Sequence, residues 1–575
     1  MDPEFIPTSF PRYWHGVTKN HVSVQASFKR FAFDTETICG KVFATGFKDD
    51  RGFQMLHGLG LDHFGWLIER ILSIPGTGRS SMVGAAHYLI FDLGVLLWPI
   101  VNPRNETRDR APNRSRFSHL ATRIEVDVFW GKPCFMCLRR NKRAITIIDT
   151  YSFFTMSLAN ALKMVNASVQ KLDKPDKLGY RVIPEAEVRP YLEADCGGVY
   201  ELLGFIEDLH RKYKTRLCYS LPMMSARVFR HAFLKKDFPQ PSAPLVQASM
   251  LSYHGGKNSF VAAVGWHRDC WDLDINSAYP EAMRQLPDFE HGSWREGEDL
   301  AFVRAHRHGI YRVWGHIKHC TWPCLSTHDF HPAVGLVRGL WTTGYELLEA
   351  IDSGELRLDK VVGWGFHESP DAGESAFTRF VDHFYALRMK TTDPGWKYFY
   401  KLLLNSLYGK FVQRNEVEDE EGTRSFEAGS CFDPSIASLI TGFVRARLHR
   451  LEHKYKSLHT ATDGFITQRR PDPRDCGSSL GKLKQENYGP VLILRNKLYI
   501  HYDGKTRQIA KTGLHGFEGT AAELLKLYKQ SKRIYKVKRL CKWAEAWHKG
   551  IPPGVEFEKE RELRIGDIVN SEEEI

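Results

Sequence analysis

Short runs of alternating apolar and polar residues near the start of the chain predict β-strands. Phe31 and Phe33 alternate with less bulky residues, a pattern typical of a strand with one buried face. A strand, a tight turn and a second strand are therefore expected over residues 29–47. The Arg-, Asn- and Pro-rich stretch 102–117 predicts an exposed loop instead.

Apolar residues at helical spacing mark a second group of segments. The segments expected to be helical are 184–208, 377–390, 396–408, 434–455 and the basic tract 526–549. Gly409 ends the third of these helices. The Thr-Thr-Asp-Pro-Gly breaker before that helix is so short that the two helices it joins should be antiparallel.

The middle of the chain returns to strand-like patterns. Residues 272–280 predict a strand that stops at Pro280, and a strand–turn–strand is expected around 460–465. The region 285–370 mixes short strand-like runs with Gly and Pro, which predicts a β-rich insert. The acidic run 416–421 is expected to be a solvated connector.

Composition narrows the function classes. The chain has 575 residues, of which 42% are hydrophobic, and it carries a formal net charge of +12. These values exclude wholesale disorder, a collagen-like chain and a small disulfide scaffold, and they favour a polyanionic partner only weakly. The most apolar stretch, 85–101, is interrupted by His87 and Asp92, so no membrane span is expected.

The cysteine content indicates a reducing environment. Eleven cysteines form an odd set spread along the chain, and no secretory signal opens it. We expect free thiols and an intracellular, soluble protein. Residues Met1 to Phe5 resemble a cloning scar and do not enter the fold prediction.

Four carboxylates on three predicted elements form the first candidate site. Asp34 and Glu36 lie two residues apart, on one face of a strand. Asp92 follows an apolar run, and Asp195 shares a helix face with Tyr191. Mg²⁺ prefers hard carboxylate oxygens, and two such ions activate water and stabilise the leaving oxygen at a phosphodiester. Each acid taken alone is also explained as a surface or capping residue.

A second candidate site lies on the predicted helix 396–408. Its polar face carries Lys397, Lys401, Asn405 and Tyr408 at helical spacing. Such a face can hold a triphosphate and contact a base. An ordinary amphipathic helix with a solvated basic side explains the same spacing.

A third candidate site pairs two aspartates. Asp274 ends a predicted strand, and Asp463 sits at a tight Thr-Asp-Gly turn. Brought together, they could bind a metal pair for nucleotidyl transfer, which is largely electrostatic chemistry. Each aspartate alone is also a common turn residue.

A cluster of His and Cys residues is a competing metal signal. Its members are His316, His319, Cys320, Cys324, His328 and His331. The Cys-x-x-x-Cys-x-x-x-His spacing is compatible with zinc, but scattered residues in a β-rich insert are the simpler explanation. Cys134 and Cys137 form a CxxC pair without a second pair to complete it.

Seven short motifs follow one another along the chain. They are Asp34-Thr-Glu36, Phe91-Asp92, Tyr191-x-x-x-Asp195, Tyr253-His-Gly255-Gly256, Asp274-x-x-Ser277-Ala-Tyr279-Pro280, Lys401-x-x-x-Asn405-Ser406-x-Tyr408-Gly409 and Lys497-x-Tyr499. In this order they resemble the motifs of family B DNA polymerases, most closely the compact, protein-primed group of bacteriophages and linear plasmids. The resemblance runs from about residue 30 to residue 500.

The resemblance implies a role for each motif residue. Asp274 and Asp463 would hold two Mg²⁺ ions for polymerisation, with Mn²⁺ able to substitute. Two further ions for 3′–5′ exonuclease action would be held by Asp34, Glu36, Asp92 and Asp195, with Tyr191 and Lys171 beside them. Nucleotide-binding residues would be Tyr279, Lys401, Asn405, Tyr408, Ser277 and, as weaker candidates, Lys390 and Lys397. DNA-binding residues would be Tyr253, Gly255, Gly256, Lys497, Tyr499, Phe91, Ser406 and Gly409.

The same resemblance implies an α/β and α+β multidomain fold, with an RNase H-like exonuclease domain and a right-hand polymerase domain. The expected divisions are exonuclease 1–215, palm 216–284 and 428–505, β-rich insert resembling the terminal-protein region 285–370, two-helix fingers 371–412, short connector 413–427 and thumb 506–575. Primer-template DNA and dNTPs are the expected partners of a monomeric enzyme of a phage, plasmid or other mobile element. A terminal-protein primer is left open.

Three departures limit these expectations. The family's Tyr-x-Asp-Thr-Asp-Ser motif reads His459-Thr-Ala461-Thr-Asp463-Gly464 here, so its first acid is missing. Tyr88 replaces an asparagine of the second exonuclease motif, and the stretch before His459 is too short for strong strand displacement to be expected. A primer-independent polymerase, a 3′–5′ exonuclease with a degenerate polymerase site and a DNA-binding structural protein stay open as alternatives.

Overall fold

The computed structural model covers most of the chain. The residues that it describes are 14, 16–20, 28–75, 82–104, 111–141, 143–175, 181–329, 331–418, 424–502, 507–511, 517, 519–531 and 533–565. Met1 to Phe5 and parts of the predicted segments 102–117 and 416–421 lie outside these residues. Among the described residues, no helix combines the length and the apolar content that a bilayer crossing requires.

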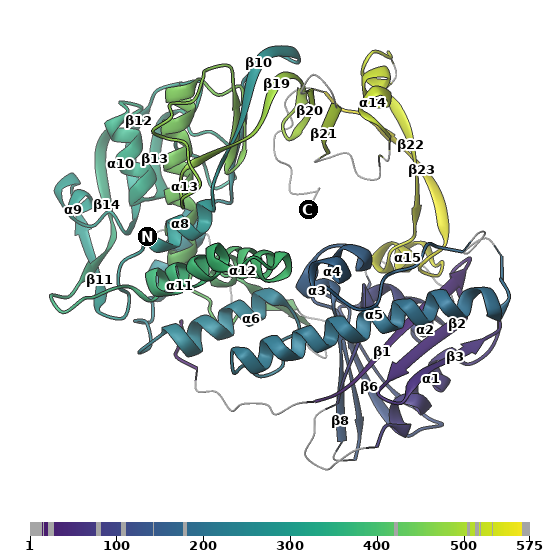
Figure 1. The fold of residues 1–575 in the computed structure, drawn as a ribbon. Helices are drawn as coiled ribbons and strands as arrows, with labels where there is room; N and C mark the ends of the chain where they lie inside the picture. The colour runs from purple at the N-terminus through teal and green to yellow at the C-terminus, as the bar shows by residue number, and fades with distance from the viewer. Residues whose placement is uncertain are drawn as a thin grey trace.

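The N-terminal third forms a mixed eight-stranded sheet (Figure 1). Its strands are, in spatial order, β3 (Gly52–His57), β2 (Lys41–Asp49), β1 (Lys29–Ile38), β4 (Met82–Ala86), β8 (Arg143–Asp149), β7 (Phe135–Arg140), β6 (Ile124–Phe129) and β5 (Arg114–His119). β1 runs antiparallel to β2 and parallel to β4. The predicted strand–turn–strand over 29–47 is thus confirmed, whereas the end of the predicted loop 102–117 belongs to β5.

Helices cover both faces of this sheet. Phe31 and Phe33 pack with residues of α1 (His63–Ser73) and α2 (Leu89–Val101). Ala32, which points the other way, packs with residues of α5 (Glu185–Lys212). The prediction that only one face of β1 is buried is therefore wrong, because α5 crosses the second face and brings its own apolar stripe.

The central sheet has seven strands. They are, in spatial order, β21 (Arg507–Lys511), β20 (Leu498–Tyr502), β19 (Leu483–Arg495), β10 (Gly265–Ile275), β18 (Gly464–Thr467), β17 (His459–Thr462) and β9 (Lys257–Phe260). β10 is followed by α8 (Ala278–Arg284), so Pro280 does not end the strand but occupies the first turn of a helix, where its missing N–H costs nothing. β17 and β18 confirm the predicted strand–turn–strand. β21 lies beyond the expected palm boundary at residue 505.

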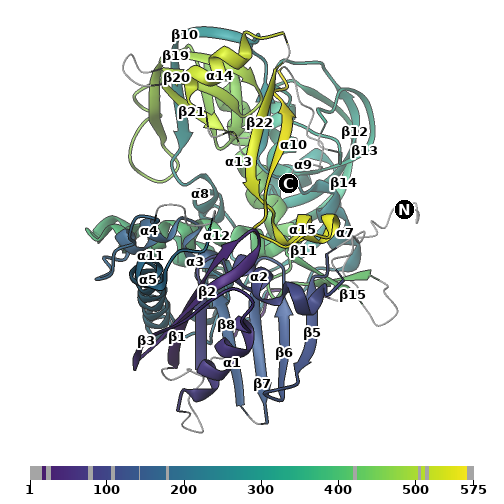
Figure 2. The same ribbon diagram turned by 90° about the vertical axis from the view of Figure 1, so that its right-hand side faces the viewer.

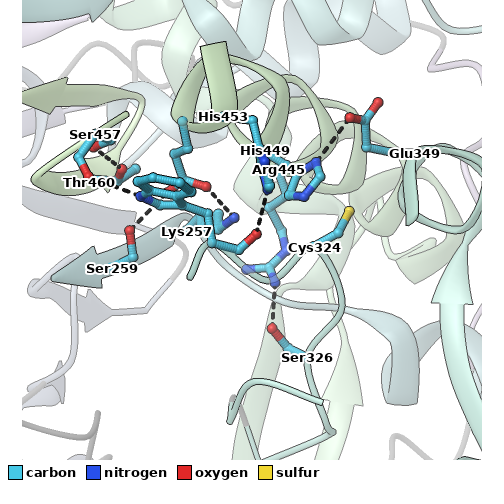
Figure 3. Close-up of polar contacts among 12 residues, drawn as sticks. Lys257, Ser259, Cys324, Ser326, Glu349, Arg445, His449, His453, Ser457 and Thr460 are labelled. Carbon is cyan, nitrogen blue, oxygen red and sulfur yellow. Dashed lines mark hydrogen bonds and ion pairs between the residues drawn. The ribbon is translucent and has the colours of Figure 1, made fainter. Parts of the chain in front are cut away.

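The predicted β-rich insert is a third sheet of four strands. Their spatial order is β11 (Gly292–Glu298), β14 (Leu356–Glu368), β12 (Gly309–Ile317) and β13 (Gly335–Thr343), with helices α9 (Leu300–Ala305) and α10 (Gly344–Asp352) beside them. α13 (Pro434–Tyr455), predicted with these bounds, packs on α10 and β13 of the insert and is joined to β9 of the central sheet by the Lys257–Glu452 ion pair. Figure 3 shows this junction, where Arg445 donates to Ser326 (2.7 Å) and His449 pairs with Glu349 (2.9 Å).

A layer of helices lies between the first sheet and the central sheet. It contains α3 (Tyr151–Phe154), α4 (Leu158–Met164), α6 (Leu221–Val228), a π-helical turn (Phe229–Phe233), α11 (Ala376–Lys390), α12 (Pro394–Ser406) and a 3₁₀ turn (Tyr408–Val412), whereas α7 (Ala243–Ser252) packs on α13 and on β12 and β13 of the insert. α11 and α12 pack against each other, as the short breaker between them predicts. A continuous apolar core runs from this layer into both neighbouring units.

One prediction for the connecting segments is wrong. The described start of the acidic run 416–421 belongs to β15 (Arg414–Glu418), which pairs antiparallel with β16 (Arg424–Ala428), and residues 419–421 lie outside the described residues. The basic tract 526–549 is not one helix but α14 (Ala521–Tyr528), β22 (Ile534–Leu540) and α15 (Trp543–Lys549), and β22 pairs with β23 (Glu556–Glu562). The reason lies in the apolar alternation of β22, where Tyr535 and Val537 are buried between exposed basic residues.

The C-terminal hairpin reaches across to the first sheet. Figure 2 shows β22 and β23 running down to α15, which lies beside α2. Trp543 stacks on Trp130 with ring centroids 3.7 Å apart, and Trp98 meets Trp543 and Trp547 edge-on at 6.0 Å. Buried aromatic contacts therefore join the N-terminal sheet and its helix α2 to α15 near the C-terminus.

Candidate functional site

The first acidic site lies where the end of β1 meets α5. Asp34 and Glu36 point from one face of β1, on the side that α5 covers, and Asp195 faces them from that helix. One carboxylate oxygen of each lies within 4.8 Å of the others. Asp195 Oδ1 is buried and has no hydrogen-bond partner among the described residues. Three carboxylates with a bare oxygen among them fit a divalent cation.

Asp92 joins this site from the other face of the sheet. Its Oδ1 accepts hydrogen bonds from the Thr35 hydroxyl (2.7 Å) and the Thr35 amide (3.2 Å). The charge on Asp92 raises the pKa of Asp34, so the two carboxylates are neighbours. Asp34, Glu36 and Asp195 thus lie within ligating distance of one another, and Asp92 lies beside them without belonging to that group.

Lys171 and Tyr191 complete the first site. The Lys171 ammonium donates to the Tyr191 hydroxyl at 3.0 Å and to the Asp195 carboxylate. Burial lowers the pKa of Lys171, but the ion pair and both hydrogen bonds outweigh burial and raise it. Lys171 is thus a fixed positive charge at the edge of the acidic cluster.

Burial is the main cause of the raised pKa values in this cluster. It raises the pKa of Glu36 to about 7 and that of Asp92 to about 8, and repulsion by neighbouring acids adds to both. The pKa of Asp34 lies well above its usual range, and that of Asp195 is raised in spite of Lys171. Carboxyl groups crowded in this way favour a cation in their midst.

Sequence reasoning missed Asp149, a fifth buried acid beside this site. Its carboxylate accepts the backbone N–H groups of Tyr88 and Tyr151, each at 2.9 Å. Tyr88 adopts a left-handed conformation (φ 73°) at the start of α2. Asp149 therefore shapes the backbone that presents Asp92 rather than offering free oxygens. The only sequence signal was an acid directly after the apolar run of β8.

The second acidic site is built by the central sheet. Asp274 of β10 pairs with Gly464 of β18, and Asp463 occupies the turn directly before Gly464. The Ile275 amide donates to the Asp463 carbonyl at 2.9 Å, which holds the turn against the end of β10. The structure therefore brings the two predicted aspartates together.

Charge is concentrated around this pair. Burial, followed by the charges of Asp463, Glu486 and Asp272, raises the pKa of Asp274 to about 7. Burial also raises the pKa of Asp463, although Lys401 and Lys497 lie close enough to oppose the rise. Asp272 and Glu486 were not predicted, because a single acid inside a strand gives no signal of its own.

Aromatic rings form one wall of the second site. The rings of Tyr279 and Tyr408 stack at 4.2 Å with an angle of 5° between their planes. Burial and then the neighbouring Tyr408 raise the pKa of Tyr253 to about 12, which places Tyr253 next to this stack. Ser277 accepts a hydrogen bond from Arg388 of α11 at 3.1 Å. Arg388 was missed by sequence reasoning, which favoured Lys390 two residues later.

The predicted polar face of α12 is only partly directed at the site. Lys401 lies near Asp463, whereas Lys390 and Lys397 are exposed near the facing ends of α11 and α12. Asn405 is half-buried. The Ser406 hydroxyl donates to the Leu402 carbonyl of its own helix.

The glycines of the predicted motifs differ in their surroundings. A Cβ at Gly256 would lie 2.7 Å from Thr462 Cγ2 and 2.9 Å from its Cα, so the loop before β9 packs directly on the turn that carries Asp463. A Cβ at Gly255 or Gly409 would meet open space. The buried Lys257–Glu452 ion pair ties the same loop to α13.

The remaining DNA-binding candidates lie in two places. Lys497 adopts a left-handed turn (φ 57°) between β19 and β20, and its amide donates to His459 Nε2 at 2.7 Å. Tyr499 follows on β20. Phe91 of α2 lies beside the loop before β23, because a Cβ added to Gly554 would lie 3.1 Å from its ring.

The zinc hypothesis is wrong for the described residues. Asp34, Glu36 and Asp195 are the only group of three or more His, Cys, Asp or Glu that the described chain brings within ligating distance. Cys324 is buried and donates to the Glu346 carbonyl, and His316 is exposed on β12. Sequence spacing could not show that these side chains point apart. Cys134 and Cys137 likewise belong to no such group.

Part of the chain matches known DNA polymerases in sequence. The family model for DNA polymerase type B, organellar and viral, matches residues 174–422. The DNA-directed DNA polymerase of Enterobacteria phage PRD1 is 24% identical over 394 residues, which is 62% of this chain and 66% of the phage protein. A probable DNA polymerase of Agaricus bitorquis is 29% identical over 410 residues, which is 62% of this chain and 50% of the fungal protein.

The chain resembles type B DNA polymerases in sequence, and the matched region 174–422 lies inside it. Phi29 DNA polymerase complexed with primer-template DNA has a similar fold, with a TM-score of 0.66, 19% identity and coverage of 93% of this chain and 100% of that one. The expected fold class, an exonuclease-type α/β domain plus a right-hand domain, is confirmed. The chain spans at most about two thirds of the length of the two relatives named.

Proposed function

We propose that the chain is a DNA-templated DNA polymerase that transfers nucleotides from dNTPs to a primer 3′-hydroxyl. The observation that supports this most is the meeting of Asp274 and Asp463 at the end of β10, with Lys401 beside them. The two acids repel each other, and no described Lys or Arg forms an ion pair with either of them. A polymerase needs such a place for the metal-bound triphosphate.

Asp274 and Asp463 are the residues that would hold Mg²⁺ for this reaction. When bound, the ions neutralise the triphosphate and lower the pKa of the attacking hydroxyl. Lys401 binds the incoming phosphates, with Lys390 and Lys397 as weaker candidates, and Asn405 lines the base pair. Tyr279, which stacks on Tyr408, would lie under the sugar and exclude a 2′-hydroxyl by contact, and Tyr408 would line the base pair together with Asn405. Arg388 holds Ser277 at the edge of the nucleotide site.

A 3′–5′ exonuclease activity belongs to the same proposal. Asp34, Glu36, Asp92 and Asp195 would hold the metal ions, which activate water at a phosphodiester. Lys171 fixes Asp195 and the Tyr191 hydroxyl, so that Tyr191 can orient the attacking water. Residues 1–215 would form this domain. The palm would be 216–284 and 428–505, the terminal-protein region 285–370, the fingers 371–412, the short connector 413–427 and the thumb 506–575, although β21 extends the central sheet beyond residue 505.

Primer-template DNA and dNTPs are the proposed partners. The solved structures of similar fold include Phi29 DNA polymerase complexed with primer-template DNA and incoming nucleotide substrates. Lys497 and Tyr499 would hold the primer strand, and the other DNA-binding residues would be Tyr253, Gly255, Gly256, Phe91, Ser406 and Gly409. The enzyme would be monomeric, and a terminal-protein primer stays open as a further partner.

A labelled primer-template incubated with Mg²⁺, with and without dNTPs, tests the proposed function. We expect extension when dNTPs are present and shortening when they are absent. Ala461 and Gly464 favour a second candidate, an exonuclease with a degenerate polymerase site, and shortening under both conditions would support it. Synthesis on a template without a DNA primer would identify primer-independent initiation.

A further inference from the structure

Asp272 is a carboxylate that the proposed mechanism does not use. Side chains alternate along β10, so Asp272 and Asp274 share one face, while Leu273 between them is fully buried on the other. Register places Asp272 opposite Ile466 of β18 on one side and Asn487 of β19 on the other. Asp272 therefore lies in the middle of the sheet, one pleat behind Asp274.

One cavity connects Asp272 to the primer motif. It has a volume of about 390 Å³ and is lined by residues of five adjacent strands, among them Asp272, Asp274, His459, Ala461, Glu486 and Tyr499. Position 461, where the family motif has an acid, contributes only a methyl group to this cavity. The space beside Asp274 is therefore open toward Tyr499.

Both residues of the Lys497-x-Tyr499 motif are tied to the metal-binding strands. The Tyr499 hydroxyl donates to Asp272 Oδ2 at 3.4 Å. The ring of Tyr499 meets the ring of His459 edge-on at 5.4 Å, and His459 Nε2 accepts the Lys497 amide at 2.7 Å. His459 stands on β17, the strand that leads to Asp463. β19 and β20 are thus held at two points, Asp272 and His459.

We propose that Asp272 is a positioning residue that holds the Tyr499 phenol beside Asp274 before the primer arrives. This inference rests on the proposed polymerase function. Asp272 acts through Tyr499 and touches no reacting atom. Because Asp272 already holds the Tyr499 phenol, the phenol loses little conformational freedom when the primer binds. Asp272 should therefore increase the affinity for primer-template more than it increases the rate of nucleotide addition to a bound primer.

Single-turnover addition of one nucleotide, measured against primer-template concentration, tests this proposal. Asp272→Leu removes the acceptor, Asp272→Asn retains an amide oxygen that can accept, and Tyr499→Phe removes the donor. We expect Asp272→Leu and Tyr499→Phe each to weaken primer-template binding about tenfold, with the rate at saturation changed less than about threefold. The double variant with Asp272→Leu and Tyr499→Phe should bind primer-template as tightly as either single variant. Asp272→Asn should retain most of the wild-type affinity. Tyr488→Phe, which removes an exposed phenol from β19, is the matched control.

Three results would overturn the proposal. The first is that Asp272→Leu binds primer-template as tightly as the wild type. The second is that the losses of affinity of the two single variants multiply in the double variant. The third is that Asp272→Asn binds as weakly as Asp272→Leu, because the charge and not the hydrogen bond would then matter. If Asp272→Leu unfolds at a lower temperature than the wild type, the comparison of Tyr499→Phe with Asp272→Asn decides. A wild type that adds no nucleotide would refute the proposed function instead.

Discussion

Substitution of Asp92 by Asn should stabilise the metal-free first acidic site. The Asp92 side chain is almost fully buried, and burial is the main reason why its pKa rises from 3.8 to about 8. When the pKa of a carboxyl group is higher in the folded than in the unfolded state, the group lowers the free energy of unfolding at any pH above the unfolded-state pKa. This loss grows with pH until the pH reaches the folded-state pKa. At 1.36 kcal/mol for each pH unit, the ceiling is about 6 kcal/mol at pH 8 and above.

Structural relaxation and water entry lower that ceiling. We therefore expect Asp92→Asn to raise the free energy of unfolding by about 2–3 kcal/mol at pH 8. Asn retains the oxygen that accepts both hydrogen bonds from Thr35. Hydrogen exchange of the β1 and β4 amides measures the effect, with exposed Asp173→Asn as the control. The gain should vanish near pH 4, and Mg²⁺ should stabilise the wild type more than Asp92→Asn. A loss of stability at pH 8, or an equal gain at pH 4, would refute the reasoning.

Three further predictions follow from single contacts. Gly256→Ala should lower primer extension at least about tenfold while primer shortening persists, because its Cβ would push on Thr462 beside Asp463; a gel assay of both activities checks this. Trp543→Ala should reduce the free energy of unfolding by about 3–5 kcal/mol in denaturant titrations, since it removes a buried indole stacked on Trp130. Lys171→Met should slow primer shortening about a hundredfold without affecting extension, and equal rates for variant and wild type would contradict the positioning role.

Local sequence patterns predicted those elements whose own residues determine them. α13 has the predicted bounds because Asp433 caps its first turn and its apolar residues keep helical spacing to Tyr455. The tract 526–549 was predicted wrongly because its lysines suggested one helix, although Tyr535 and Val537 already alternate as in a strand. Docking of Trp543 on a residue more than 400 positions away is a tertiary contact that no local pattern contains.

The same contrast holds for the functional residues. Asp34 and Glu36 share a strand face, and Asp195 shares a helix face with Tyr191, so spacing alone indicated acidic clusters. The fold decides which of these acids lie close together in space. It also decides the role of isolated acids such as Asp149 and Asp272, because these accept hydrogen bonds from residues that are distant in sequence. The His and Cys residues around Cys324 were close in sequence, yet their strands and loops direct them apart.

Incorporation of a single dNTP by Asp463→Asn, compared with the wild type and with Asp269→Asn, tests the central claim most directly. Asp269 is an exposed carboxylate on the same β10 strand as Asp274, with a left-handed backbone (φ 51°) that asparagine tolerates. We predict that Asp463→Asn lowers the incorporation rate by about three orders of magnitude or more, while Asp269→Asn and primer shortening are unchanged. Incorporation by Asp463→Asn at the wild-type rate would contradict a polymerase site formed by Asp274 and Asp463.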